Sequence, residues 1–192
     1  VLGGRAPDAD AVIEARKREA LIELARHSQP HDGQKAFWDT LNVGYFMRHD
    51  ATDIAWHTRQ LSRQLMVAKS KAESMGVTVR ARLSPVGEGL QVMVYAPDQA
   101  DLFARICGYF DQTGFNILDA KVHTATNGYA LDTFQVVTYF TKEHYRDLIN
   151  LVETGLTQTI DLAKPLPTPS KGRMSRRVKN FPITPRVSLQ PD

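Results

Sequence analysis

The chain contains very little cysteine, since Cys107 is the only one among its 192 residues. A single thiol excludes an intramolecular disulfide and a zinc site closed by several cysteines. No apolar run approaches the roughly 20 residues that a membrane-spanning helix needs. The sequence also lacks a glycine-rich phosphate loop, a paired-carboxylate site and a nucleophile triad. These absences predict a protein of a reducing compartment, the cytoplasm, without a catalytic site and without a membrane partner.

Charge is nearly balanced, with a formal net charge of +3 at pH 7 from 24 basic and 21 acidic residues. So small an excess does not by itself indicate nucleic-acid binding. We interpret the basic run over 171–179 as part of a solvated, proline-rich linker, with phosphate contact as the alternative. The chain begins at Val1 with neither a methionine nor a signal peptide, so we expect it to be a piece of a longer protein.

Residues 1–75 are predicted to form a helical segment. Asp8 or Asp10 can cap a first helix that ends near residue 27, and a short helix around Trp38 follows a turn. Asp50 or Thr52 can cap a longer helix that ends before residue 76. In this helix the residues expected on the buried face recur at intervals of three or four: Ile54, Thr58, Leu61, Leu65 and Ala68.

Beyond Gly76 the apolar period changes from about 3.6 to 2, which is the change from helix to strand. Residues 77–83 fit a strand or an extended connection. Gly114 is expected to end a helix, and Asn127-Gly128 is typical of a hairpin turn. From Gly89 onward the predicted order is strand, helix, strand, strand, helix, linker and strand, over residues 90–96, 102–114, 116–124, 129–136, 142–160, 163–180 and 181–189.

This order predicts an α+β fold of the ferredoxin-like βαββαβ type, with a four-stranded antiparallel sheet and two helices on one face. The expected domains are the helical segment 1–75 and the α+β domain 76–192. The opposite face of the sheet should be open to water or to a partner, and it should carry Met93, Tyr95, Lys121 and His123. The sequence does not say whether residues 1–75 pack on this domain.

Two His-Asp pairs suggest the metal centre of an HD phosphohydrolase, but neither fits it. His31-Asp32 lies in a predicted turn, and Asp50, which follows His49, is better placed as a helix cap. That chemistry also requires a further histidine upstream and an aspartate downstream. We therefore expect neither pair to bind a metal ion.

Three other features have structural explanations. Cys107 lies on an apolar helix and is expected to be a small buried residue, and His57 is expected to be an exposed imidazole on a packed helix. A βαββαβ sheet is also the fold of an RNA-recognition motif, whose third strand carries an aromatic-rich octamer. Residues 129–136 lack that octamer, and Asp132 would repel phosphate. We therefore expect no nucleic-acid binding through the sheet.

The segments 95–98, 102–106, 116–124 and 131–136 together resemble an ACT domain. Upstream, Tyr45–His49 followed by Ile54–Thr58 resembles the segment that precedes the first ACT domain in the family of bifunctional PII uridylyltransferase/uridylyl-removing enzymes. The resemblance extends from about residue 40 to the C-terminus. It identifies the chain as a C-terminal segment of such an enzyme, with a linker and the first ACT domain.

The resemblance implies a cytoplasmic nitrogen sensor. In this family a nucleotidyltransferase domain, expected to use Mg, adds UMP to a tyrosine of the PII signalling protein, an HD domain removes it, and two ACT domains sense glutamine. The catalytic groups would lie before Val1, so this segment should hold no metal or cofactor. The expected partners are glutamine as effector, PII through the whole enzyme, and a second ACT domain or another copy of the chain.

The resemblance also implies candidate ligand-binding residues, namely Pro97, Asp98, Gln99, Asn116 and Ile117. Asp98 and Gln99 could hydrogen-bond the ammonium or amide group of the ligand, and the backbone near Asn116 could reach the ligand of a partner domain. ACT domains that hold amino acids often have a glycine in the loop that here reads Pro97-Asp98-Gln99-Ala100. Because that glycine is missing, a structural ACT-type interaction module that binds no small molecule remains the alternative.

Overall fold

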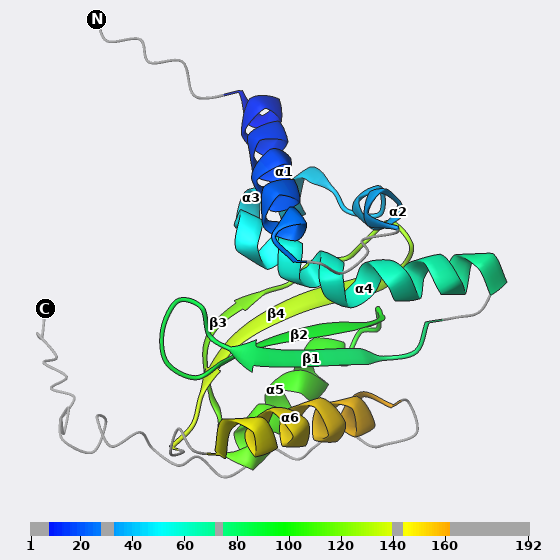
Figure 1. The fold of residues 1–192 in the computed structure, drawn as a ribbon. Helices are drawn as coiled ribbons and strands as arrows, with labels where there is room; N and C mark the ends of the chain where they lie inside the picture. Colours follow the sequence, from blue (N-terminus) through cyan, green and yellow to red (C-terminus); the bar gives the residue numbers. More distant parts are fainter. Residues whose placement is uncertain (1–7, 28–32, 72–74, 140–143, 162–192) are drawn as a thin grey trace, which may run out of the picture.

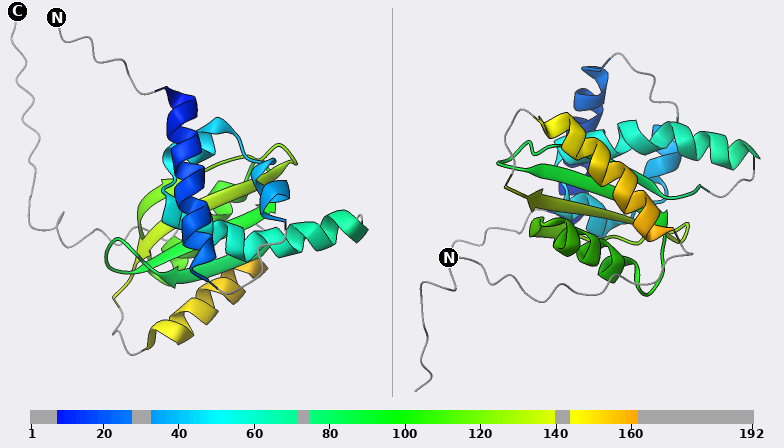
Figure 2. Two further views of the ribbon diagram at one scale, coloured as in Figure 1. Left: turned by 45° about the horizontal axis from the view of Figure 1, so that its top comes forward. Right: turned by 90° about the horizontal axis from the view of Figure 1, so that it is seen from below.

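A computed structural model describes residues 8–27, 33–71, 75–139 and 144–161, which form three layers (Figure 1). A four-stranded antiparallel sheet is the middle layer. The helices that precede the sheet lie over one of its faces, and the two later helices lie across the other (Figure 2). Within these residues no helix is both long and apolar enough to cross a membrane.

The helical segment consists of α1 (Ala9–Ala25), α2 (Gln34–Trp38), α3 (Val43–Arg48) and α4 (Ala51–Lys71). The Asp8 carboxylate caps α1 by accepting the N–H of Asp10, and Asp50 Oδ1 caps α4 by accepting the N–H of Asp53 at 2.8 Å. Of the two alternatives predicted for each helix, the caps are therefore Asp8 and Asp50. Helix α3, which begins after the cap residue Asn42, is a short element that the apolar spacing does not predict.

The sheet contains β1 (Thr78–Leu83), β2 (Leu90–Pro97), β3 (Asn116–Lys121) and β4 (Tyr129–Val137) in the order β1-β2-β4-β3. Helices α5 (Leu102–Thr113) and α6 (Tyr145–Ile160) pack on one face. Gly114, in the left-handed region at φ 81°, ends α5 as predicted. The predicted class is confirmed: an α+β, ferredoxin-like sheet with two helices on one face, preceded by a helical segment.

The fourth strand of this sheet is β1, whereas the sequence pattern assigned that place to residues 181–189. Those residues and the linker 163–180 lie outside the described part of the chain. Strand β1 reaches its place through a short hairpin to β2, closed by the bond from the N–H of Ser84 to the carbonyl of Gly89 at 3.0 Å. At Gly89 a Cβ would come within 2.1 Å of the carbonyl oxygen of Val136, so only glycine fits there.

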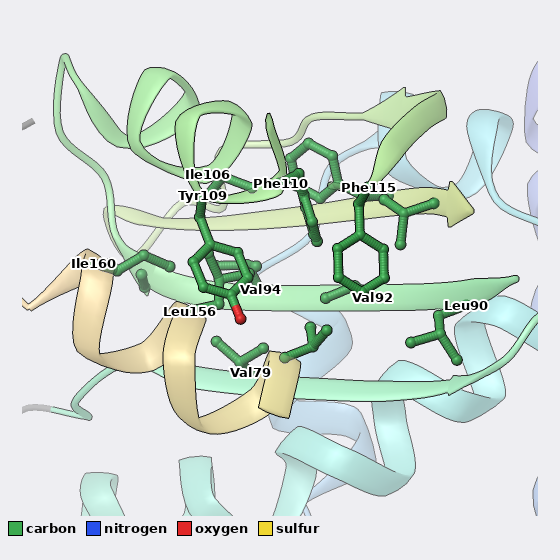
Figure 3. Close-up of a cluster of buried hydrophobic side chains, with 14 of the residues drawn as sticks. Val79, Leu90, Val92, Val94, Ile106, Tyr109, Phe110, Phe115, Leu156 and Ile160 are labelled. Atoms are coloured by element: carbon green, nitrogen blue, oxygen red, sulfur yellow. The ribbon is translucent and has the colours of Figure 1, made fainter. Parts of the chain in front are cut away.

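The main core lies between the sheet and helices α5 and α6 (Figure 3). Phe134 on β4 is fully buried and contacts the ring of Phe110 on α5, with 5.7 Å between the ring centroids. The alternating residues of β2 that face this core are Leu90, Val92, Val94 and Ala96. The period of 2 in the sequence therefore corresponds to this buried face.

The other face of the sheet is not open, because the helical segment covers it. Met93 and Tyr95 on β2 and Leu131 on β4 are 0% exposed and share a second core with Tyr45 and Ile54. Burying side chains of this size contributes roughly 1.5–3 kcal/mol each. Residues of the helical segment and of the sheet thus form one continuous hydrophobic cluster.

Strand β3 is an edge strand with an irregular register. It pairs with β4, and the pairing shifts between Ile117 and Asp119, which leaves Leu118 62% exposed. The regular alternation of the two faces is therefore interrupted at this point of the strand. An irregularity of this kind at a sheet edge weakens the backbone template that another strand would need for pairing.

Candidate functional site

A cavity of about 390 Å³ lies beside the loop that joins β2 to α5. This volume is within the range of pockets that hold small molecules. Residues 98–100 of the loop and the first turn of α5, at Leu102 and Phe103, line one part of the cavity. The rest is lined by Ala120, residues 122–124, and the β4 residues Ala130 and Asp132.

The loop at the cavity is fixed by the hairpin turn next to it. Pro97 ends β2, and the N–H of Asp98 then donates to the carbonyl of Gly128 at 3.0 Å. The hydroxyl of Thr124 donates to Asp98 Oδ2 at 3.3 Å. The carbonyl of Gln99 accepts the N–H of Leu102, which begins α5. Local hydrogen bonds therefore hold this loop without a glycine.

The structure brings together some of the predicted ligand-binding residues and separates others. Asp98 and Gln99 both line the cavity, and Pro97 precedes them without lining it. Asn116 and Ile117 begin β3, where they pair with Val137 and Val136, and they do not line the cavity. A ligand role for any of these residues stays a prediction.

The sequence reasoning did not identify Asp132 as a member of the site. This residue is 4% exposed, although it lies on a strand whose neighbouring residues are mostly apolar. Its Oδ1 accepts the backbone N–H of His123 at 3.3 Å. Burial, together with the negative charge of Asp98, raises the pKa of Asp132 to about 6 against the partial opposition of that hydrogen bond. An acidic residue inside an otherwise apolar strand was the signal that could have identified it.

The residues that line the cavity include no lysine or arginine. His123 is the only one of them that could carry a positive charge, and burial, with the nearby His49 and Arg48, lowers the pKa of its ring. Its Nε2 is buried and has no hydrogen-bond partner within the described residues. The ring of His123 instead contacts the ring of Tyr45 in the helical segment, with 5.4 Å between the ring centroids. The cavity therefore presents two carboxylates, the amide of Gln99 and the hydroxyl of Thr124 beside apolar walls.

Behind the cavity, a second group of polar side chains joins the helical segment to the sheet. His57 on α4 is fully buried, which corrects the expectation of an exposed imidazole. Its Nδ1 lies 2.6 Å from the hydroxyl of Tyr45, and its Nε2 lies 3.1 Å from the hydroxyl of Thr133 on β4. Burial lowers the pKa of His57, as does the charge of neighbouring groups including His49. The ring is therefore a neutral link between two layers.

Asp53 is the charged centre of this second group. Gln91 donates to its Oδ1 at 2.9 Å, Arg82 donates to the same atom at 3.1 Å, and Lys121 Nζ lies 3.7 Å from Oδ2. Burial alone would raise the pKa of Asp53, but His49, Gln91, His57 and Lys121 hold it well below its usual value. Asp53 is thus a buried ion with several partners, unlike Asp132.

Within the part of the chain that the structure describes, the features considered for other chemistry do not form reactive sites. His49 Nδ1 is 3.7 Å from Asp53 Oδ2, which is too far for a hydrogen bond, and the described residues contain no group of three or more side chains placed to hold a metal ion. His31 and Asp32 lie outside the described residues. Cys107 is half-buried, and burial raises the pKa of its thiol, which disfavours the reactive thiolate.

Comparison with known proteins gives a consistent result. Residues 8–60 match the family model described as the fifth domain of the uridylyltransferase GlnD. The whole chain is 52% identical over 192 residues to proteins named bifunctional uridylyltransferase/uridylyl-removing enzyme from Burkholderia thailandensis and Burkholderia mallei. It spans 22% of the length of each of these relatives. No solved structure shows a significant match to the chain.

Proposed function

This chain belongs to the same sequence family as the matched segment of the bifunctional uridylyltransferase/uridylyl-removing enzymes, and we propose that it is a regulatory, glutamine-sensing segment of such an enzyme. Its ACT-type domain binds the amino acid and controls the balance between the two opposing reactions. The sequence identity along all 192 residues supports the link to these enzymes. The cavity that contains Asp98 and Gln99 supports ligand binding.

The single observation that carries the sensing role is the position of this cavity. It lies beside the loop between β2 and α5, which corresponds to the loop that the resemblance to ACT domains indicated for the ligand. A ligand there contacts residues 122–124, and the carbonyl of Val122 in that segment accepts a hydrogen bond from Arg48 of the helical segment at 3.2 Å. Binding and the position of the helical segment can therefore influence each other.

The proposal extends to the whole enzyme. It acts in the cytoplasm on the PII protein, its nucleotidyltransferase domain uses Mg, and the catalytic groups belong to parts outside this chain. Glutamine favours the arrangement that removes UMP over the one that transfers it. A ligand produces such a shift only through a difference in its affinity for the two arrangements. Further partners of this domain are a second ACT domain or another copy of the chain.

A second candidate function is a structural interaction module that binds no small molecule. The loop 97–100 favours it, because it has no glycine to let a ligand approach the backbone closely. The bond between Thr124 and Asp98 also occupies one of the polar groups at the cavity. In that case the domain contributes contact surface alone.

Calorimetric titration with L-glutamine separates the two functions. The sensing role requires saturable heat on this chain, on a full-length enzyme of the family, or on both. A full-length enzyme whose two activities respond to glutamine, combined with a variant at Asp98 that abolishes the response, would assign the sensor to this cavity. Absence of glutamine binding by both proteins would favour the structural module.

A further inference from the structure

The carboxylate of Asp132 is unusual among the buried charges of this protein. Asp53, the other strongly buried carboxylate, lies within 4 Å of Arg82 and Lys121. Asp132 forms no ion pair with another described residue, and the hydrogen bond of its side chain to the described residues is the one that Oδ1 accepts from the backbone N–H of His123. A buried carboxylate is normally paired with a cation or with several hydrogen-bond donors. The missing partner is therefore the feature that needs an explanation.

The surroundings of Asp132 show where that partner would lie. Asp132 lines the cavity together with Asp98, which adds a second negative charge. Val122 and Phe103 contribute apolar walls and are themselves 45% and 48% exposed, so the cavity opens to solvent. The cavity therefore has the size and the sign of charge that suit a small organic cation.

Another wall of the cavity is formed by the amino end of a helix. The first turn of α5 lines it at Leu102 and Phe103, and α5 is a helix of 12 residues. The amino end of a helix carries a partial positive charge that favours an anion. A molecule with both an ammonium group and a carboxylate would therefore find a complementary group at each end.

We propose that Asp132 is the residue that binds the ammonium group of the ligand, with Asp98 as a second, weaker partner, and that the cavity selects α-amino acids with a free amine. This inference rests on the proposed glutamine-sensing function and adds to it the orientation of the ligand. The amine lies at Asp132, the carboxylate lies near the start of α5, and the side chain is left to contact the remaining walls. Gln99, at the loop, is placed to contact the amide group.

The experiment measures binding of three compounds to the 192-residue chain by calorimetry. L-Glutamine carries both charged groups, 4-aminobutanamide keeps the ammonium and lacks the carboxylate, and 4-carbamoylbutanoate keeps the carboxylate and lacks the ammonium. We expect L-glutamine to bind most tightly, 4-aminobutanamide to bind more weakly, and 4-carbamoylbutanoate not to bind. Equal binding of 4-carbamoylbutanoate and L-glutamine would overturn the ammonium assignment.

Variants then test the residue. Asp132→Asn should weaken binding of both amines by about 10- to 100-fold, which is the usual effect of losing a charge-assisted hydrogen bond. Asp119→Asn, at an exposed position of β3, is the matched control and should leave binding unchanged. Circular dichroism checks that Asp132→Asn is folded. If it is not folded, Asp98→Asn at the exposed end of the site provides the test with a smaller expected loss.

The outcomes separate this inference from the proposed function. Glutamine binding that is unaffected in a folded Asp132→Asn variant overturns the ammonium assignment and leaves glutamine sensing intact. Binding of 4-aminobutanamide that depends on Asp132, without binding of glutamine, supports the ammonium site but contradicts both the selection of α-amino acids and glutamine sensing. If none of the three compounds binds, both proposals are wrong for this chain.

Discussion

Thr133 on β4 and His57 on α4 are 76 residues apart in sequence, yet the hydroxyl of Thr133 lies 3.1 Å from Nε2 of His57. Nδ1 of the same ring lies 2.6 Å from the hydroxyl of Tyr45 on α3. A neutral imidazole has one nitrogen that donates and one that accepts, so these two hydroxyls satisfy both. The ring is therefore the point at which α3, α4 and the sheet are held in one arrangement.

Replacing Thr133 with valine keeps the volume of the side chain and removes the hydroxyl. Because Nε2 of His57 then loses its partner in a buried place, we expect Thr133→Val to lower the free energy of unfolding by about 1–3 kcal/mol. The free energy of unfolding is measured by urea titration monitored with circular dichroism. Thr126→Val, at an exposed position in the turn, is the control and should change the value by less than about 0.5 kcal/mol. Equal effects of the two substitutions would contradict the linking role of His57.

The sequence predicted the elements whose signals are local. The alternation of apolar residues predicted strands near 90–97 and 129–137. Gly114 predicted the end of α5, and Asp50, as one of two candidate caps, predicted the start of α4. It did not predict that residues 78–83 form the fourth strand, because pairing with β2 depends on the hairpin closing in three dimensions. The covered face was also missed, since Met93 and Tyr95 have the same pattern whether water or a helix lies above them.

Asp132 makes a pH-dependent contribution to stability. Its pKa rises from 3.8 to about 6 on folding. Below the lower value the carboxyl is protonated in both states; between the two values the unfolded chain is ionised while the folded chain keeps its proton. Stability from this group therefore falls as pH rises through this interval and stays low above it. Two pKa units correspond to about 3 kcal/mol.

Asp132→Asn removes this cost because asparagine does not ionise. We expect the variant to be more stable than the parent at pH 8, by up to about 3 kcal/mol, with the advantage declining toward pH 4. Thermal unfolding of both proteins across this pH range measures the difference. Asp119→Asn, which is exposed, should show no such dependence. A destabilised Asp132→Asn variant at pH 8 would mean that a favourable partner of the carboxylate exists.

The site was less predictable than the fold for the same physical reason. Asp98 and Gln99 could be identified because their loop has a recognisable place in the ACT pattern. Asp132 was missed although an acidic residue in an apolar strand is a signal, because that signal does not say whether a cation lies nearby. The absence of such a cation among the described residues depends on which side chains of β3 and α5 surround Asp132. His57 likewise has a sequence context that suits either a buried or an exposed ring.

Replacing Phe134 tests how much the core between the sheet and the two later helices contributes to the free energy of unfolding. Phe134 is 0% exposed and contacts the rings of Phe110 and Phe103. We expect Phe134→Ala to cost about 3–5 kcal/mol, whereas Lys121→Ala, which loses a partly exposed charge near Asp53, should cost under about 1 kcal/mol. Urea midpoints of the two variants test this difference. Similar losses would show that the ion group around Asp53 contributes as much as the core.

The exposed apolar residues of β3 predict that the chain associates through this edge. Ile117 is 36% exposed, Leu118 is 62% exposed and Val122, just beyond the strand, is 45% exposed. The shifted register disturbs the backbone at Leu118, so contact through side chains is favoured over continuation of the sheet. We expect a dimer that dissociates at micromolar concentration, with an association energy of about 6–8 kcal/mol.

Leu118→Glu should weaken this dimer at least about tenfold because it places a charge in the contact. Leu151→Glu is the matched control, since Leu151 on α6 is 55% exposed and remote in sequence from β3. Sedimentation equilibrium over a range of concentrations measures both variants. A strict monomer at roughly 100 μM, well above the expected dissociation constant, or a dimer that Leu151→Glu weakens as much as Leu118→Glu does, would contradict association through β3.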